Sequence, residues 1–112
     1  MTEALLLIDI QNDYFPGGAM ECTGMEQASD VAYALLEKFR GEKKPVFFIR
    51  HLSIREGASF FLPGTLGSEI HDRVAPGPGE AVIEKHFPNS FFQTGLLGAL
   101  KEKGVTDCVI CG

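Results

Sequence analysis

The chain has 112 residues, enough for one small domain, and its 45% of hydrophobic and 22% of charged residues are typical of a globular protein. The net charge of −5 argues against nucleic acid or an anionic membrane surface as the main partner, because both need clustered lysine and arginine. No apolar run reaches the roughly 18 residues that a membrane-spanning helix requires, so we expect no membrane segment.

The first predicted element is a buried β-strand over residues 4–9 that ends in an acidic side chain. Its apolar run from Leu5 to Ile8 is continuous rather than alternating, as in a parallel strand covered on both faces. Asp9 closes the run, and a carboxylate there is costly unless it is paired. Because ligands bind at the carboxyl ends of the strands in open α/β sheets, Asp9 is a candidate site residue.

A loop over residues 10–24 precedes a predicted helix and a second strand. Apolar residues recur at three- and four-residue spacing from Met25 to Phe39, which predicts an amphipathic helix that stops near Gly41. Residues 46–50 are expected to form a second strand, in which the apolar run from Val46 to Ile49 is followed by Arg50. A strand, a helix and a second strand in this order predict a right-handed parallel crossover.

The second half of the chain begins irregularly and then returns to the same pattern. Residues 65–74 could hold a short helix, and a third strand is expected at residues 81–83, just before Lys85. Thr94 can cap a second helix that carries leucines on one face and ends at Gly104. A fourth strand is expected at residues 108–111.

The three cysteines have no regular spacing, which favours reduced thiols in a cytoplasmic protein over a disulfide framework. We expect Cys108 to be a buried structural thiol at the start of the fourth strand, at the edge of the sheet opposite Asp9. Cys111 is expected to be a small core residue. Cys22 lies in the first loop, within reach of a site.

Asp9 and Lys85 are both expected to project toward the edge of the sheet where the strands end. An ammonium and a carboxylate at this edge form either a structural ion pair or a pair that activates a third group, and residue type alone leaves both interpretations open. His51 follows the second strand, where a substrate contact is one interpretation and a polar loop histidine is the other. Five phenylalanines can cover the sheet or wall a pocket: Phe60, Phe61, Phe87, Phe91 and Phe92.

Neither a metal site nor a nucleotide site is expected. The three histidines lack the close spacing of metal ligands, and no second ligand follows His51. No glycine-rich phosphate-binding motif follows the first strand. We therefore expect no metal and no cofactor.

The ordered set of these segments resembles the isochorismatase-like cysteine hydrolases. The segment LLLIDIQNDYF at residues 5–15 resembles the opening of that family. Three further segments match the family's pattern in the same order: Arg50 and His51 at a strand end, PGTLG at residues 63–67, and VIEKHFPNSF at residues 82–91. TGLLGAL at residues 94–100 and the last strand complete the match, which covers essentially the whole chain.

This resemblance implies an α/β, Rossmann-like fold with three α/β/α layers and a parallel sheet, of which only the first four of six strands are present. It implies an Asp-Lys-Cys catalytic triad, in which Asp9 matches the acid and Lys85 the lysine. Gln11, Phe15, His51 and Ser90 are the residues that we expect to contact a small-molecule substrate. The substrate class implied is a small amide or related C–N compound, and we expect a homo-oligomer.

The family's nucleophilic cysteine follows the fourth strand by several residues, at a position that neither Cys108 nor Cys111 occupies. We therefore expect residues 1–112 to be the N-terminal part of a single hydrolase domain, to be inactive alone, and to dock a C-terminal segment beside the fourth strand. An apolar strand edge carrying Val109 and Ile110 would otherwise be unpaired.

Two other classes of protein compete with the hydrolase. The first is a catalytically silent family member that serves as a binding or assembly module. The second is a receiver-like domain or an aspartyl phosphatase, which also has an aspartate after its first strand. The phosphatases need a second aspartate two residues later, where this chain has Gln11, and receivers need an acidic pair that is missing here.

Overall fold

The apolar runs of the sequence form the centre of a parallel β-sheet with the strand order β3-β2-β1-β4. The computed structural model describes all 112 residues. Its strands are β1 (Glu3–Ile8), β2 (Val46–His51), β3 (Ala81–Lys85) and β4 (Asp107–Cys111), and all of their pairings are parallel. The expected parallel pairing of the first two strands and the four-stranded sheet are confirmed.

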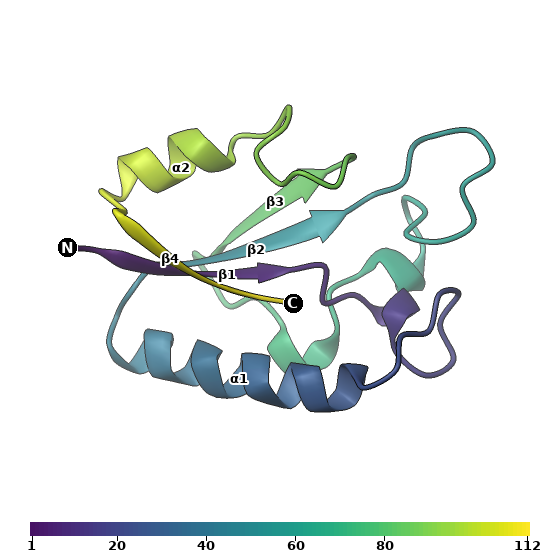
Figure 1. Ribbon diagram of the computed structural model, residues 1–112, viewed down its shortest axis with the longest axis horizontal. Coiled ribbons are helices and arrows are strands. Elements are labelled where there is room, and N and C mark those ends of the chain that lie inside the picture. The colour runs from purple at the N-terminus through teal and green to yellow at the C-terminus, as the bar shows by residue number, and fades with distance from the viewer.

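The sheet is covered on both faces, which gives the three layers seen in Figure 1. Successive side chains of a strand point to opposite faces, so Leu5 and Leu7 pack in one core cluster and Leu6 packs in the other. Helix α1 (Met25–Gly41) covers the first cluster with buried residues that include Leu36. Helix α2 (Leu96–Glu102) covers the second.

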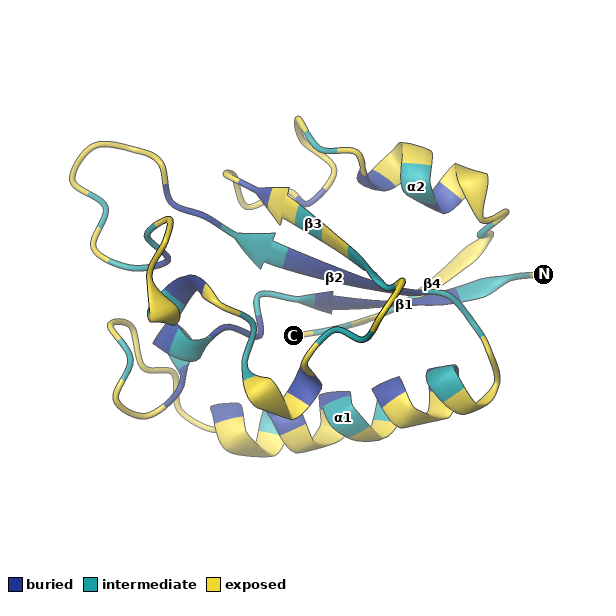
Figure 2. Ribbon diagram, turned by 180° about the vertical axis from the view of Figure 1, so that it is seen from behind, coloured by how far each residue is buried: buried dark blue, intermediate teal, exposed yellow.

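Burial is concentrated in the two central strands (Figure 2). Four residues of β1 and four of β2 are buried, whereas β4 has none and its Ile110 is 64% exposed. This open edge contradicts the prediction that Cys108 is buried, because no element covers β4 there and the thiol is exposed. Cys111 is partly buried and packs against the α1 cluster.

Two local expectations need correction. The segment 65–74 forms two short 3₁₀ helices, η2 (Leu66–Ser68) and η3 (Asp72–Val74), in place of one α-helix. Helix α2 begins one residue later than a Thr94 cap would place it, with Gly95 at its N-cap. The Thr94 hydroxyl still accepts a hydrogen bond from the Leu96 N–H at 3.3 Å. None of the helices is long and apolar enough to cross a membrane.

Candidate active site

Asp9 lies directly after β1, where the chain turns away from the sheet. Its backbone N–H donates the last hydrogen bond of the β1–β2 ladder, to the Ile49 carbonyl at 3.0 Å. Its φ of 57° is in the left-handed region, which aspartate tolerates better than most residues and which turns the chain away from β2. One carboxylate oxygen, Oδ1, is buried without a hydrogen-bond partner. A buried acceptor without a hydrogen bond costs free energy, and a ligand that donates a hydrogen bond to it would remove this cost.

Lys85 is the last residue of β3, and its side chain crosses the end of β2 to reach Asp9. Lys85 is 2% exposed, and its Nζ lies 3.2 Å from Asp9 Oδ2. The same ammonium lies 3.1 Å from Nδ1 of His51, the β2 residue beside Lys85 in the sheet register. The two residues from separate strands that were expected at this edge are therefore in contact.

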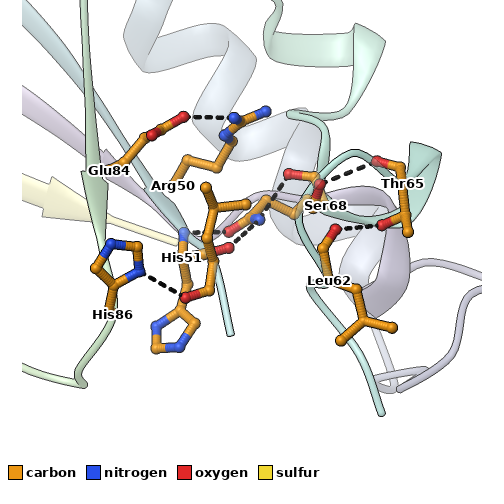
Figure 3. A network of polar contacts seen from close by, with 9 residues as sticks. Arg50, His51, Leu62, Thr65, Ser68, Glu84 and His86 are labelled. Carbon is orange, nitrogen blue, oxygen red and sulfur yellow. Dashed lines mark hydrogen bonds and ion pairs between the residues drawn. The ribbon is translucent and has the colours of Figure 1, made fainter. Parts of the chain in front are cut away.

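The charges around His51 favour its neutral form. Burial lowers the pKa of His51, and the Lys85 ammonium lowers the pKa further, while the Asp9 carboxylate opposes both effects. The His86 ring adds a smaller lowering effect. His86 contacts the Leu52 carbonyl through Nδ1 at 2.9 Å, and Figure 3 shows its ring beside that of His51.

Asp9, His51 and Lys85 line a cavity of about 210 Å³ at the carboxyl edge of the sheet. Its other walls are aromatic or apolar: Tyr14, Phe60, Phe61 and Pro88. Two of the five phenylalanines thus wall a pocket, while the remaining three are exposed on the loop after β3. A second hollow of about 640 Å³ shares Asp9 and Tyr14 and extends toward Ile110 and Cys111 at the end of β4.

Tyr14, like Pro88, lines this cavity without having been predicted from the sequence. It belongs to the 3₁₀ helix η1 (Asn12–Tyr14), and its ring packs edge-on against Phe61 at 4.7 Å. Burial and the Asp9 charge raise the pKa of Tyr14, so its hydroxyl stays protonated at neutral pH. The sequence offered no periodic pattern in this loop that could separate Tyr14 from its neighbour Phe15.

Phe15 and Ser90 were predicted to contact substrate, and the structure places both away from the cavity. The η1 turn directs Phe15 to the other side, where it is buried and stacks on His71 at a centroid distance of 3.8 Å. Ser90 lies in the loop after β3, where Pro88 is the residue that reaches the cavity. The Ser90 carbonyl instead accepts a hydrogen bond from the Thr94 hydroxyl at 2.6 Å.

Gln11 was also predicted to contact substrate, but its side chain is fully buried and its amide is used inside the chain. Its Nε2 donates to the carbonyls of His51 and Ser68, both at 2.8 Å, and its Oε1 accepts from the His51 N–H at 2.8 Å. Figure 3 shows His51 and Ser68 linked through these hydrogen bonds. The amide takes the place of the backbone hydrogen bonds that end at Asp9, and in this way Gln11 holds the backbone of His51.

Gln11→Glu should therefore destabilise the fold by about 2–4 kcal/mol, because the carboxylate loses both donors and faces two carbonyl oxygens. The measurement is the urea midpoint at constant m-value. Gln27→Glu makes the same change at an exposed position in the first turn of α1 and should be close to neutral. Equal midpoints for the two variants would contradict the assignment.

No thiol of the chain lines the 210 Å³ cavity. Cys108 pairs with Ala4 at the opposite end of the sheet. Cys22 and Cys111 line the adjoining 640 Å³ hollow, and burial raises the pKa of Cys111, which disfavours its thiolate. No three His, Cys, Asp or Glu side chains gather into a set that could hold a metal ion.

Comparison with known proteins gives a consistent family match. The model of the isochorismatase domain matches residues 3–112. The Bacillus subtilis protein YddQ, an uncharacterized isochorismatase family protein, is 53% identical over 112 residues, which are all of this chain and 62% of YddQ. The chain thus spans about three fifths of the length of that relative.

Solved structures agree with this match. A protein from Oleispira antarctica, described as an isochorismatase hydrolase, superposes with a TM-score of 0.92 at 45% identity, over 97% of this chain and 59% of its own. N-carbamoylsarcosine amidase from Thermoplasma acidophilum superposes with a TM-score of 0.88 at 26% identity, over 98% of this chain and 66% of its own. The four strands and their helices are therefore an arrangement that both of these proteins share.

Proposed function

The chain belongs to the isochorismatase family, and from this premise we propose that it supplies the acid–base half of a hydrolase for small amides or related C–N compounds. The observation that carries the proposal is the contact between a fully buried ammonium and a carboxylate with one idle oxygen. Lys85 and Asp9 meet at the wall of a cavity, and an N-carbamoylsarcosine amidase has the same fold.

In this proposal Asp9 is the base and Lys85 the electrostatic partner of a cysteine thiolate. Asp9 takes the proton of the thiol, and the thiolate attacks the carbonyl carbon of the substrate. The C–N bond breaks, the amine leaves with the proton, and water then hydrolyses the thioester with Asp9 as base. Lys85 stabilises the thiolate and the negative charge that develops on attack.

The thiol in this scheme comes from residues that follow Gly112 in the complete protein. The basis is twofold: no thiol lines the cavity of Asp9 and Lys85, and the relatives are longer than this chain. Those residues would also pair with β4, where Ile110 is exposed at an unpaired strand edge. Residues 1–112 would then be the N-terminal part of one domain and inactive alone.

The shape of the cavity favours a small substrate with an apolar body. Two phenylalanines, a tyrosine and a proline border about 210 Å³, which leaves room for a compact molecule whose polar group faces Asp9 and Lys85.

A fusion protein tests the proposal. Residues 1–112 would be joined to the C-terminal part of the Bacillus relative that follows the matched region, and ammonia release would be measured with a panel of small primary amides and N-carbamoyl compounds. We expect hydrolysis by the fusion and none by residues 1–112. Hydrolysis by residues 1–112 alone, or an inactive but folded fusion, would count against the proposal.

Lys85→Ala in that fusion should lower kcat/KM about 100-fold, the usual loss when one preorganised charge is removed from a site. Lys85→Met keeps most of the packing volume of this buried side chain and should lose activity to a similar extent. Lys103→Ala is the matched control, since this exposed lysine lies at the other end of the sheet. Unchanged turnover in both Lys85 variants would reduce Lys85 to a structural role.

A catalytically silent binding module is the second candidate, and the lack of a thiol in the cavity is the observation that favours it. Thiol labelling of the complete protein with iodoacetamide at neutral pH separates the two candidates. A fast-reacting cysteine beyond residue 112 supports the hydrolase. Uniformly slow labelling supports the binding module.

A further inference from the structure

We propose that His51 works in this site as a neutral ring of fixed tautomer, with Nδ1 accepting a hydrogen bond from Lys85 and Nε2–H donating one to a carbonyl oxygen of the ligand. This inference rests on the proposed function, because it assigns the ligand contact of the same cavity. It also identifies the chemical group that the cavity selects: an oxygen acceptor, as in a neutral amide.

The tautomer follows from the chemistry of the lysine. A lysine ammonium has three N–H donors and no acceptor, so the 3.1 Å contact with Nδ1 of His51 requires a lone pair on that nitrogen. A neutral imidazole with a lone pair on Nδ1 carries its proton on Nε2. The second contact of the ammonium, with Asp9 at 3.2 Å, holds Lys85 in this orientation.

The charged and titratable groups around the ring are consistent with a neutral His51. Lys85 on β3 faces Nδ1 directly, and a charged imidazole would bring an N–H against this ammonium. Asp9 at the end of β1 is the only negative charge among the groups that shift the pKa of His51. It raises this pKa, whereas burial of the ring, Lys85 and His86 lower it. Tyr14 lines the same cavity as a protonated hydroxyl.

Contacts with Gln11 and Phe61 fix the position of the His51 ring. The Gln11 amide binds both the N–H and the carbonyl of His51, each at 2.8 Å. The ring packs beside Phe61 at a centroid distance of 5.9 Å. The backbone and the ring of His51 are thus both held in place. The contact with Lys85 therefore costs little conformational entropy, because the ring is already ordered.

The ring nitrogen Nε2 is left for the ligand. It has no hydrogen-bond partner within the chain, and His51 lines the cavity together with Asp9 and Lys85. A fixed N–H donor beside an ammonium suits a carbonyl oxygen, on which negative charge increases during acyl transfer. A cationic ligand has no acceptor to offer these two donors, so it cannot form the same hydrogen bond with His51.

The first test is ¹⁵N NMR of residues 1–112 labelled at histidine, which reads the tautomer without any activity assay. We expect Nδ1 of His51 to be unprotonated and Nε2 to carry the proton at neutral pH. In Lys85→Met the pKa of His51 should rise, because the Lys85 charge that lowers it is gone. A ring protonated on Nδ1, or charged at neutral pH, would overturn the inference.

The second test titrates acetamide against ethylammonium on the same labelled chain. The ¹⁵N chemical shift of His51 Nε2 should change with acetamide concentration until it reaches a plateau, and it should not change with ethylammonium. The proposed ligand contact would be overturned if the Nε2 chemical shift did not change with acetamide, or if it changed equally with both compounds. Hydrolysis by the fusion protein is a separate result, so the proposed function can fail while the tautomer and the acetamide shift remain as expected.

Two variants separate the two ring nitrogens in the fusion. His51→Asn retains an oxygen acceptor near the Nδ1 position and loses the Nε2 donor, whereas His51→Phe retains a ring and loses both. We expect KM to rise about fivefold in His51→Asn with a smaller change in kcat, since one neutral hydrogen bond contributes about 1 kcal/mol. His51→Phe should lower kcat as well, because Lys85 loses its second partner. Identical kinetics in the two variants would contradict the division of roles.

Discussion

Asp9→Asn in the fusion protein is expected to lower hydrolysis about 1,000-fold or more, with the fold intact. An asparagine amide cannot take a proton from a thiol, so the thiolate would not form at neutral pH. The fold survives because the amide oxygen can still accept the hydrogen bond that Lys85 Nζ now donates to Asp9 at 3.2 Å. The measurements are kcat/KM, the thermal midpoint and the rate of thiol alkylation by iodoacetamide at neutral pH.

Asp107→Asn provides the matched control for this prediction. It makes the same change at an exposed aspartate at the amino end of β4, the edge of the sheet away from the cavity. Its activity and alkylation rate should equal those of the unmodified fusion. If Asp9→Asn also kept the original alkylation rate, Asp9 would not be the base, and the contact with Lys85 would be a structural ion pair.

Gly67→Ala is expected to destabilise the chain by about 3 kcal/mol, because a Cβ at this position would overlap the Asp13 carboxylate. Asp13 is buried and cannot move freely. Its Oδ1 accepts from the Ala19 N–H at 3.0 Å and its Oδ2 from the Phe61 N–H at 2.8 Å. If the Asp13 carboxylate moved to make room for the Cβ, one of these charge-assisted hydrogen bonds would break. Each of the two bonds holds a loop that borders the site.

Gly98→Ala is the control for the glycine variant. Gly98 lies inside α2, and nothing comes within 4 Å of a Cβ added there. Alanine should therefore stabilise the chain by about 0.5–1 kcal/mol through its higher helix propensity. Urea unfolding of both variants measures the difference. A Gly67→Ala midpoint at or above that of the unmodified chain would show that Asp13 does not hold the two loops as described.

Sequence patterns alone were sufficient to predict the sheet and the proximity of two of its charged side chains. Continuous apolar runs such as Leu5–Ile8 read as strands covered on both faces, and the helical spacing between two of them implied the parallel crossover. Parallel strands bring their carboxyl ends to one edge. The positions of Asp9 and Lys85 after two such runs were therefore sufficient to predict that they lie together.

The residues that surround Asp9 and Lys85 could not be predicted in the same way, because loops have no periodic pattern that indicates the direction of a side chain. The η1 turn brings Tyr14 to the cavity and sends Phe15 to His71. The left-handed backbone of Asp9 leaves a gap in the ladder that the Gln11 amide fills, which buries a residue that was expected to bind substrate. The open edge of β4 likewise exposes Cys108, since burial depends on what packs against a strand and the strand's own sequence cannot specify that.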